Sequence, residues 1–248
     1  KAKMIDKRDA LTFIHEDNAV FTDYSHKMSV FGRDSVTLNI SSLEDYIYVG
    51  FHKPINAFYI NITTPNGAEG SISLEYYNGS DWNSVTNKSD DTLGLYRSGF
   101  VHWDRELSGQ SKHSVNSQSM YWYRIRPDQD RTGIVLEGLN IVFSDDYELS
   151  LEQPYIGDQE FLGSESSHIK THAAVKREII QRFRNKDYIK YNSNGEKENI
   201  TAWDLLDIEE VKLAATYLAL SKIYYQLSDN PQDVWESKSN TYMEKFNR

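Results

Sequence analysis

Two histidines four residues apart form a spacing that suits a metal ion. His168 and His172 fall on one face of an expected helix, where a pair of imidazoles can clamp a transition metal. The stretch between them lacks the glutamate of the HExxH motif, and the chain contains no cysteine that could add a thiolate ligand. We therefore expect a solvated helix end with no metal bound.

A second cluster places an imidazole near a carboxylate. His102 and Asp104 flank Trp103 at the end of an expected strand. No G-x-S-x-G elbow supplies a nucleophile, and successive strand residues point to opposite faces of a sheet. We expect ordinary strand residues here.

A third cluster has the oxygen-bearing residues of a calcium loop. Asp128 and Asp130 are followed by Gly133, which places acidic residues at alternate positions before a glycine. The third acidic position is Thr132, and no glutamate falls where an EF-hand needs its bidentate ligand. A turn between two strands explains these residues without a metal.

No residue set in the chain specifies an enzyme. The 37 acidic residues offer many carboxylate pairs for glycoside cleavage, but nothing singles out two of them. The chain has neither the phosphate-binding G-x-x-x-x-G-K-[ST] motif nor a dinucleotide fingerprint. We expect a protein that is not an enzyme and that uses no cofactor or metal, with a hydrolase kept as a distant alternative.

Net charge and hydropathy argue against nucleic-acid-binding and membrane-spanning roles. The net charge of −10 argues against a surface that grips nucleic acid by neutralising phosphates, although nucleic acid could slide past it. No apolar run approaches the roughly 20 residues needed to span a bilayer, so no membrane partner is expected.

The first part of the chain carries the pattern of short strands. Alternating or β-rich runs occupy 36–40, 46–51, 57–62, 71–77, 80–86, 99–103, 121–126 and 133–143. Asn78-Gly79 is a strong hairpin signal, and Gly138 suits a bulge. Together these features predict an antiparallel β-sandwich over 31–146, preceded by an extended arm over 1–30.

Tryptophans in this part suggest a binding alternative. Trp103 and Trp122 lie within strand patterns and are expected in the core. Trp82 follows the Asn-Gly turn and is the one expected at the surface, where a flat ring could stack on a sugar.

Helical patterns dominate the rest of the chain. The acidic stretch 147–165 contains a proline and two glycines without periodicity, and it is expected to be a linker. Helices are expected over 167–186, 201–204, 207–227 and from 231 onward, with a small turn or hairpin at 188–195. The predicted fold class is therefore α+β with two domains, a β-sandwich followed by a helical bundle over 166–248.

The expected helix 207–227 has two apolar sides. Projected at 100° per residue, one side carries Val211, Ala214, Ala215, Leu218 and Tyr225. The opposite side carries Leu213, Tyr217, Leu220, Tyr224 and Leu227. A chain with few helices can hardly cover both sides, so we expect Leu213, Tyr217, Leu220 and Tyr224 to contact another subunit.

The residues from about 151 onward resemble the head–tail connector proteins of tailed bacteriophages. The resemblance rests on the run from Trp203 to Tyr225, on the preceding segment from His172 to Phe183, and on a D-x-W-x-x-K-x-x-x-Y pattern from Asp233 to Tyr242. It covers about 40% of the chain. The first part departs from the all-helical minimal connectors and instead resembles sandwich appendages of phage neck, baseplate and fibre proteins.

The resemblance implies a location and partners. It implies a ring of about a dozen copies in the virion neck, assembled in the host cytoplasm, below the portal protein and above a downstream neck or tail protein. Genomic DNA would pass through the lumen without specific contacts. Trp235, Tyr242 and Phe246 on the last helix are the candidates for docking to the portal. The alternative is a carbohydrate-binding tail-fibre or baseplate module that uses Trp82.

Overall fold

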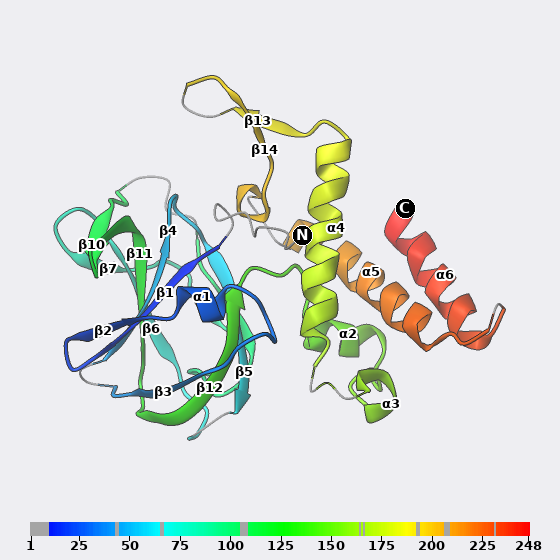
Figure 1. Ribbon diagram of the computed structural model, residues 1–248, viewed down its shortest axis with the longest axis horizontal. Coiled ribbons are helices and arrows are strands. Elements are labelled where there is room, and N and C mark those ends of the chain that lie inside the picture. The colour runs from blue at the N-terminus through cyan, green and yellow to red at the C-terminus, as the bar shows by residue number, and fades with distance from the viewer. Residues whose placement is uncertain are drawn as a thin grey trace. The chain divides into compact units, whose positions relative to one another are not determined.

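The fold is described from a computed structural model, which describes residues 10–42, 45–64, 67–104, 109–163, 165, 167–191, 194–205, 209–230 and 232–248. Within these residues the chain is α+β, with mostly antiparallel sheets and six α-helices (Figure 1). It divides into two compact units, Lys1–Ile141 and Val142–Arg248. We refer to them as unit 1 and unit 2.

Unit 1 contains a seven-stranded antiparallel sheet in the order β2-β1-β4-β11-β6-β7, with β10 also paired to β11. Its strands are β1 (Thr12–Asp17), β2 (Val20–Asp23), β4 (Tyr46–Phe51), β6 (Ile72–Tyr77), β7 (Trp82–Ser84), β10 (His113–Val115) and β11 (Gln118–Pro127). A short helix, α1 (Ser25–Met28), follows β2.

The second sheet of unit 1 has five strands in the order β3-β12-β5-β9-β8. They are β3 (Val36–Ile40), β5 (Ala57–Thr64), β8 (Ser89–Asp90), β9 (Gly99–His102) and β12 (Arg131–Asn140). The register of β12 against β5 shifts between Leu136 and Gly138, which confirms the expected bulge. A Cβ on Gly138 would lie 2.3 Å from the Phe31 ring, so the close approach itself requires glycine.

The two sheets of unit 1 face each other. The Trp103 ring, just after β9, lies 4.9 Å from the Tyr123 ring of β11, measured between centroids. The Tyr123 hydroxyl donates to the Ile55 carbonyl at 2.7 Å, and Trp103 and Tyr123 are both buried. Apolar side chains from both sheets fill the space between them, which is the arrangement of a β-sandwich.

The expected N-terminal arm is wrong for the residues that the structure describes between 10 and 30. β1 pairs with both β2 and β4, and Phe13 and Ile14 are fully buried on its two faces. Because both faces are covered, β1 lacks the alternating pattern of a half-buried strand. Residues 1–9 lie outside the described part.

One end of the sandwich is held by a buried arginine. Arg131 is completely inaccessible, and it donates to the carbonyls of Gly94 at 2.8 Å and Ala68 at 2.6 Å. Gly94 has φ +75°, and a Cβ there would lie 2.7 Å from the Gly70 backbone. The guanidinium thus ties two loops to β12.

Unit 2 is mostly helical. Its elements are α2 (Asp146–Glu152), α3 (Gln159–Leu162), α4 (Ile169–Asn185), β13 (Ile189–Tyr191), β14 (Lys197–Asn199), η2 (Ala202–Asp204), α5 (Glu209–Leu227) and α6 (Val234–Asn247). The stretch 147–165, expected to be a linker, instead contains most of α2 and all of α3. The expected short helix begins as predicted, because Thr201 and Asp204 form a capping box.

α5 packs against both α4 and α6. Lys222 on α5 forms an ion pair with Glu178 on α4 at 2.7 Å. The hydroxyls of Ser221 and Ser239 lie 3.2 Å apart between α5 and α6, and these small side chains permit close approach of the helices. Residues 207 and 208, at the expected start of this helix, lie outside the described residues. Among the helices that the structure describes, none has the length and hydropathy that crossing a membrane requires.

Candidate functional site

The outer face of the seven-stranded sheet carries a group of aromatic side chains. Strand pairing places Tyr48, Arg124 and Glu75 in one row across β4, β11 and β6, and places Tyr77 opposite Trp82. We call this group, with Tyr46, the aromatic face. Trp82 is half-buried rather than exposed as expected.

A second small core explains the burial of Trp82. Ile14, Tyr48, Val115 and Trp122 form a buried cluster on this outer face, and Trp82 packs against it. The β10–β11 hairpin folds over the sheet and supplies Val115, while the indole Nε1 of Trp122 donates to the His113 carbonyl at 3.0 Å. Trp103 and Trp122 are buried, which confirms their expected place in the core.

A cation lies over the rings of the aromatic face. The Arg124 guanidinium lies 4.5 Å from the Tyr46 ring centroid and 4.7 Å from that of Trp82, and it pairs with Glu75 at 2.6 Å. Burial raises the pKa of Tyr48, and its hydrogen bond to Glu16 at 2.7 Å raises it further. Aromatic rings beside carboxylates and a planar donor are the groups that recognise sugars, but Arg124 already covers part of the ring surface.

The two predicted histidines lie in a buried polar network at the start of α4. His172 is 1% exposed, with Nδ1 2.9 Å from the Ser144 hydroxyl and Nε2 3.0 Å from Asp146 Oδ1. His168 is also buried, and its Nε2 lies 2.9 Å from the Ile156 carbonyl. The expectation of a solvated helix end is therefore wrong, because α2 and the segment after it cover this end of α4.

The carboxylate of Asp146 is the hydrogen-bond acceptor that links the two histidines. It accepts hydrogen bonds from the His168 backbone N–H and from His172. Burial raises the pKa of Asp146, but its hydrogen bonds and electrostatic interactions with His172 and His168 outweigh burial, so that the net pKa lies below the ordinary value. The network holds α2 against α4.

Ser144, His172 and Asp146 have the residue types of a hydrolase triad in an unsuitable arrangement. The hydroxyl of Ser144 belongs to a residue only 1% exposed, whereas the Asp146 side chain is 39% exposed. The serine of a triad must reach its substrate, but here Ser144 is buried and the exposed member is Asp146. Among the described residues, no group of three or more histidine, aspartate or glutamate side chains is placed to hold a metal.

The other two polar clusters do not form sites either. His102 and Asp104 are exposed, and Asp104 accepts a hydrogen bond from Asn87 at 2.6 Å. The carboxylates of the calcium-like loop diverge. Asp128 accepts from the Ser71 backbone at 2.9 Å, whereas Asp130 accepts from the Ser42 backbone at 2.8 Å. Each aspartate therefore holds a different loop.

The candidate subunit contacts on α5 are mostly covered within the protomer. Leu220 and Tyr224 are 0% and 1% exposed, so the expectation that they face another subunit is wrong. Tyr217 is half-buried, and Leu213 remains exposed at 56%. For Tyr224, α6 supplies through Trp235 and Tyr242 the cover that was expected from a second copy.

A ladder of rings joins α6 to α5. Trp235 and Tyr242 stack on either side of Tyr224, with centroids 5.8 Å and 5.9 Å away and interplanar angles of 10° and 16°. Lys238 lies 5.0 Å from the Trp235 centroid, and Lys245 lies 4.8 Å from that of Tyr242. The aliphatic stems of these lysines shield the rings from water.

The ladder accounts for two of the three candidate portal contacts. Trp235 is half-buried and Tyr242 is buried, so both serve mainly to dock α6. The third candidate, Phe246, is half-buried under the Arg182 guanidinium, 4.3 Å from its ring centroid. Of the three, none is freely exposed.

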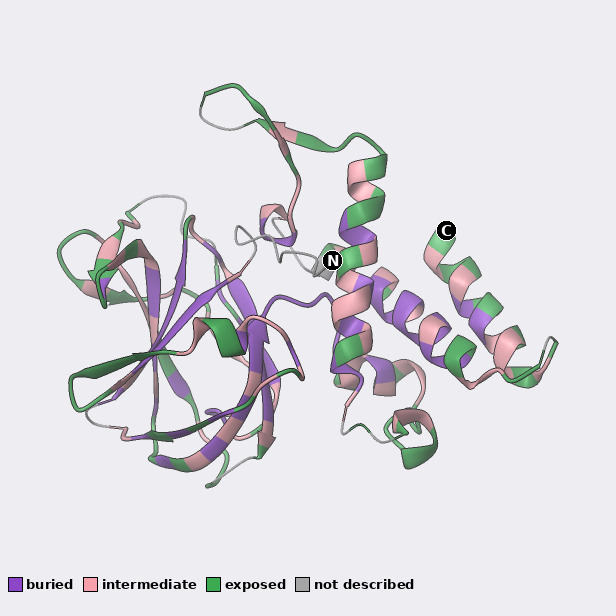
Figure 2. Cartoon of the chain, viewed as in Figure 1, coloured by how far each residue is buried: buried purple, intermediate pink, exposed green. Residues whose placement is uncertain are grey.

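Exposed apolar surface is concentrated in unit 2, in residues that sequence reasoning did not single out. Of the eleven large hydrophobic side chains exposed among the described residues, nine belong to unit 2. They are Tyr147, Leu151, Tyr155, Tyr188, Ile189, Tyr191, Leu213, Tyr225 and Val234. Figure 2 shows exposed residues of all kinds in green along the helices and hairpin of unit 2. The sequence does indicate the helix that carries Tyr147 and Leu151, because Asp145 and Glu148 have the spacing of a helix N-terminus.

No family model matches the chain, and no curated protein matches it.

Proposed function

We propose that the protein is a structural component of a tailed-phage neck, in which a small helical bundle formed by unit 2 assembles copies of the chain into a ring. In this proposal the β-sandwich of unit 1 is a second domain that decorates the ring. The ring joins the portal protein to a downstream neck or tail protein and lets genomic DNA pass. The resemblance to head–tail connectors is the starting point.

Where the structure describes them, the three segments that carry the resemblance lie mostly in helices. The segment from His172 to Phe183 lies in α4, and most of the run from Trp203 to Tyr225 lies in α5. Each fixed residue of the D-x-W-x-x-K-x-x-x-Y pattern has a role in placing α6. Asp233 caps the helix by accepting from the Glu236 backbone N–H at 2.7 Å, and Trp235, Lys238 and Tyr242 form the ladder.

The observation that carries the assembly part is the exposed apolar surface of unit 2. Soluble monomers rarely leave large apolar patches in water, and such patches mark contact surfaces. Unit 1 exposes only Val20 and Phe21 among its described large hydrophobic residues. The difference between the units supports self-assembly through unit 2. The net charge of −10 is compatible with a lumen that DNA traverses without binding.

The test is the mass and shape of the purified full-length chain. We expect mass photometry and negative-stain electron microscopy to show rings, with about twelve copies in each. Assembly should survive in Leu220→Ala, which disturbs only the interior of unit 2. A chain that stays monomeric at every concentration, alone and with a portal ring, would contradict the proposal.

A second candidate function rests on the aromatic face of unit 1. Tyr46, Tyr77 and Trp82 with Arg124 and Glu75 offer the groups used in sugar recognition, as in a tail-fibre or baseplate module. Glycan-array binding that is lost in Trp82→Ala, with the melting temperature retained, would favour this role. Its matched control is Tyr96→Ala, which truncates a half-buried tyrosine between β8 and β9 of the other sheet.

A further inference from the structure

Charge is segregated along unit 2. Residues 142–168, which include α2 and α3, contain seven acidic residues and no lysine or arginine. Residues 169–191, which include α4 and β13, contain seven lysines and arginines and two acidic residues. A protein with a net charge of −10 therefore has one strongly basic stretch next to its most acidic one.

An apolar patch lies within the acidic stretch. Tyr147 and Leu151 are four residues apart on α2 and therefore share its outer face, where both are more than 60% exposed. Tyr155 follows just beyond the helix and is also exposed, and Asp158 and Glu160 lie next in the chain. We call these five residues the α2 patch.

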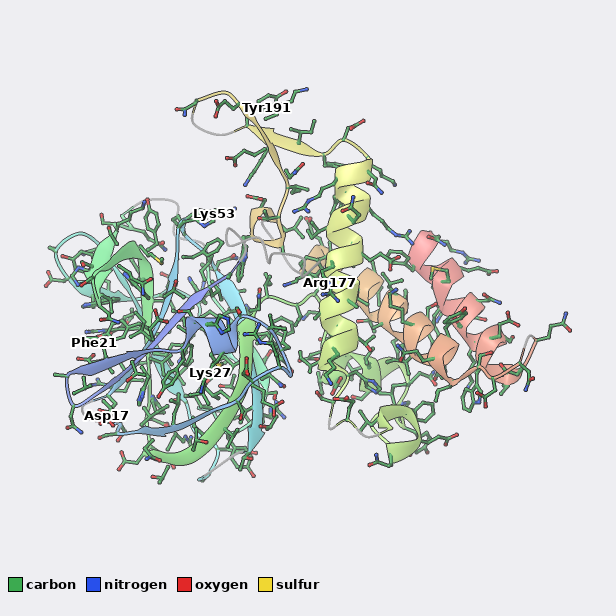
Figure 3. The ribbon with its side chains drawn as sticks, viewed as in Figure 1. Asp17, Phe21, Lys27, Lys53, Arg177 and Tyr191 are labelled. Atoms are coloured by element: carbon green, nitrogen blue, oxygen red, sulfur yellow. The ribbon has the colours of Figure 1, made fainter. Side chains whose placement is uncertain are left out.

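A complementary patch lies on the β13–β14 hairpin. Ile189 pairs with Asn199 and Tyr191 pairs with Lys197, so these four side chains share one face of the ribbon. All four are exposed, and Figure 3 shows Tyr191 on β13. We call them the hairpin face.

The other face of the ribbon is fixed to unit 2. Lys190 bridges Glu198 at 3.3 Å and Asp204 at 3.1 Å. Burial lowers the pKa of Lys190, but its contacts with Asp204 and Glu198 outweigh burial and raise it overall. The hairpin is thus anchored on one side while its apolar side stays uncovered, and a two-stranded ribbon gains stability when that side is covered.

The two patches cannot meet within one protomer. α2 is bonded to α4 at His168 and His172, whereas the hairpin begins after α4 ends at Asn185 (Figure 1). At 1.5 Å per residue these points are about 20 Å apart along the helix. Any mutual contact must therefore join two copies.

We infer that the hairpin face of one copy docks on the α2 patch of the next copy, in a head-to-tail arrangement. Lys197 on the hairpin face and Lys186 at the end of α4 would then approach Asp158 and Glu160. Among the described residues, none of these four forms an ion pair within the protomer. The dipole of α4 favours a cation at Lys186, its C-cap residue, but it does not account for Lys197, Asp158 or Glu160, because the effect is confined to the ends of the helix.

The contact is small. Tyr147, Tyr155 and Tyr191 can together bury at most about 450–750 Å² at roughly 150–250 Å² each. Leu151 and Ile189 add to this, but the sum counts both partners and stays below the roughly 1,600 Å² in total of a standard interface, so each single contact is expected to be weak. Because the two patches differ, the contact is heterologous, and it closes into a ring when the rotation between copies divides a full turn. This inference specifies the contact for the self-assembly proposed above.

Mixing two variants tests the arrangement. Leu151→Asp damages the α2 patch and Tyr191→Asp damages the hairpin face, at side chains already more than 60% exposed. Each variant alone should lose assembly, with association weakened at least about tenfold. A 1:1 mixture should form dimers and nothing larger, because the intact hairpin of the first variant docks on the intact α2 patch of the second. Mass photometry measures each case.

Controls separate this contact from the proposed function. Val20→Asp, at an exposed apolar side chain of unit 1, should assemble as the unmodified chain does. The pair Tyr155→Asp and Ile189→Asp repeats the test at different residues. If the chain forms rings and every one of these variants also forms them, the head-to-tail contact is wrong while ring assembly stands. If the chain never self-associates, both are wrong.

Discussion

Among single residues, Asp146 has the clearest dependence on pH. Its pKa lies below the ordinary 3.8, because the contacts with His172 and His168 outweigh burial. A carboxyl whose pKa is depressed on folding stabilises the protein fully above its ordinary pKa. That stabilisation is lost as pH falls below 3.8 toward the lower folded pKa.

Replacing Asp146 by asparagine tests this dependence. At neutral pH, Asp146→Asn should lower the free energy of unfolding by about 1 kcal/mol, since the partly exposed carboxylate accepts two charge-assisted hydrogen bonds. The difference from the unmodified chain should shrink as pH falls below 3.8. Urea unfolding at a series of pH values measures it, and a difference independent of pH would contradict the assignment.

Tyr224 makes the stability depend on pH in the opposite direction, because its contribution is lost as pH rises. Burial raises the pKa of Tyr224 to about 12, with Tyr242 adding to the effect. Since an unfolded tyrosine titrates near about 10, the neutral ring stabilises the fold fully below pH 10, and this is lost as pH rises toward 12.

The matching variant is Tyr224→Phe. It should cost about 1 kcal/mol at neutral pH, because the hydroxyl donates to Gln153 at 2.8 Å, and the cost should shrink above pH 10. Chemical unfolding between pH 7 and 11 measures it. Tyr225→Phe, at a side chain 69% exposed on the same helix, should leave the curve unchanged.

Lysine should not replace Arg131 without a loss of stability. Its fork reaches the carbonyls of Gly94 and Ala68 together, which a lysine ammonium cannot reproduce. Arg131→Lys should destabilise the protein by about 2–3 kcal/mol in urea unfolding. Arg177→Lys, at an exposed position on α4, is the matched control and should have little effect.

Among the elements, the strands and helices with periodic patterns were predictable. The runs expected as strands correspond to β3 to β7, β9, β11 and β12, and the helical patterns correspond to α4, η2, α5 and α6. β1 was not found because both its faces are buried. α2 was missed because proline and glycine in the acidic stretch outweighed the short helix signal at Asp145 and Glu148.

The candidate site was less predictable because burial depends on distant segments. Trp82 follows the Asn-Gly turn, which favours an exposed side chain. The β10–β11 hairpin, about thirty residues later in the chain, nevertheless contributes Val115 and Trp122 to the small core that covers part of Trp82. The periodicity of α5 predicts that both of its apolar sides need to be buried, and Leu220 and Tyr224 on the second side are buried. Periodicity does not reveal that Trp235 and Tyr242 of α6 pack against Tyr224 there.

For the whole molecule, the division into two compact units predicts separate unfolding steps. Ile125→Ala empties a fully buried position in unit 1, and Leu218→Ala does so in unit 2. Each should cost about 2–5 kcal/mol within its own unit. Calorimetry should therefore show two transitions, each variant lowering a different one. A single transition lowered equally by both would mean that the units unfold together.

The opposite charges at the two ends of α4 give unit 2 an electric moment along that helix. An approaching copy would be turned by this field before any side chains touch, which favours encounters in one orientation. Added salt should therefore slow the joining of copies more than it alters the assembly finally reached, since the apolar contact persists.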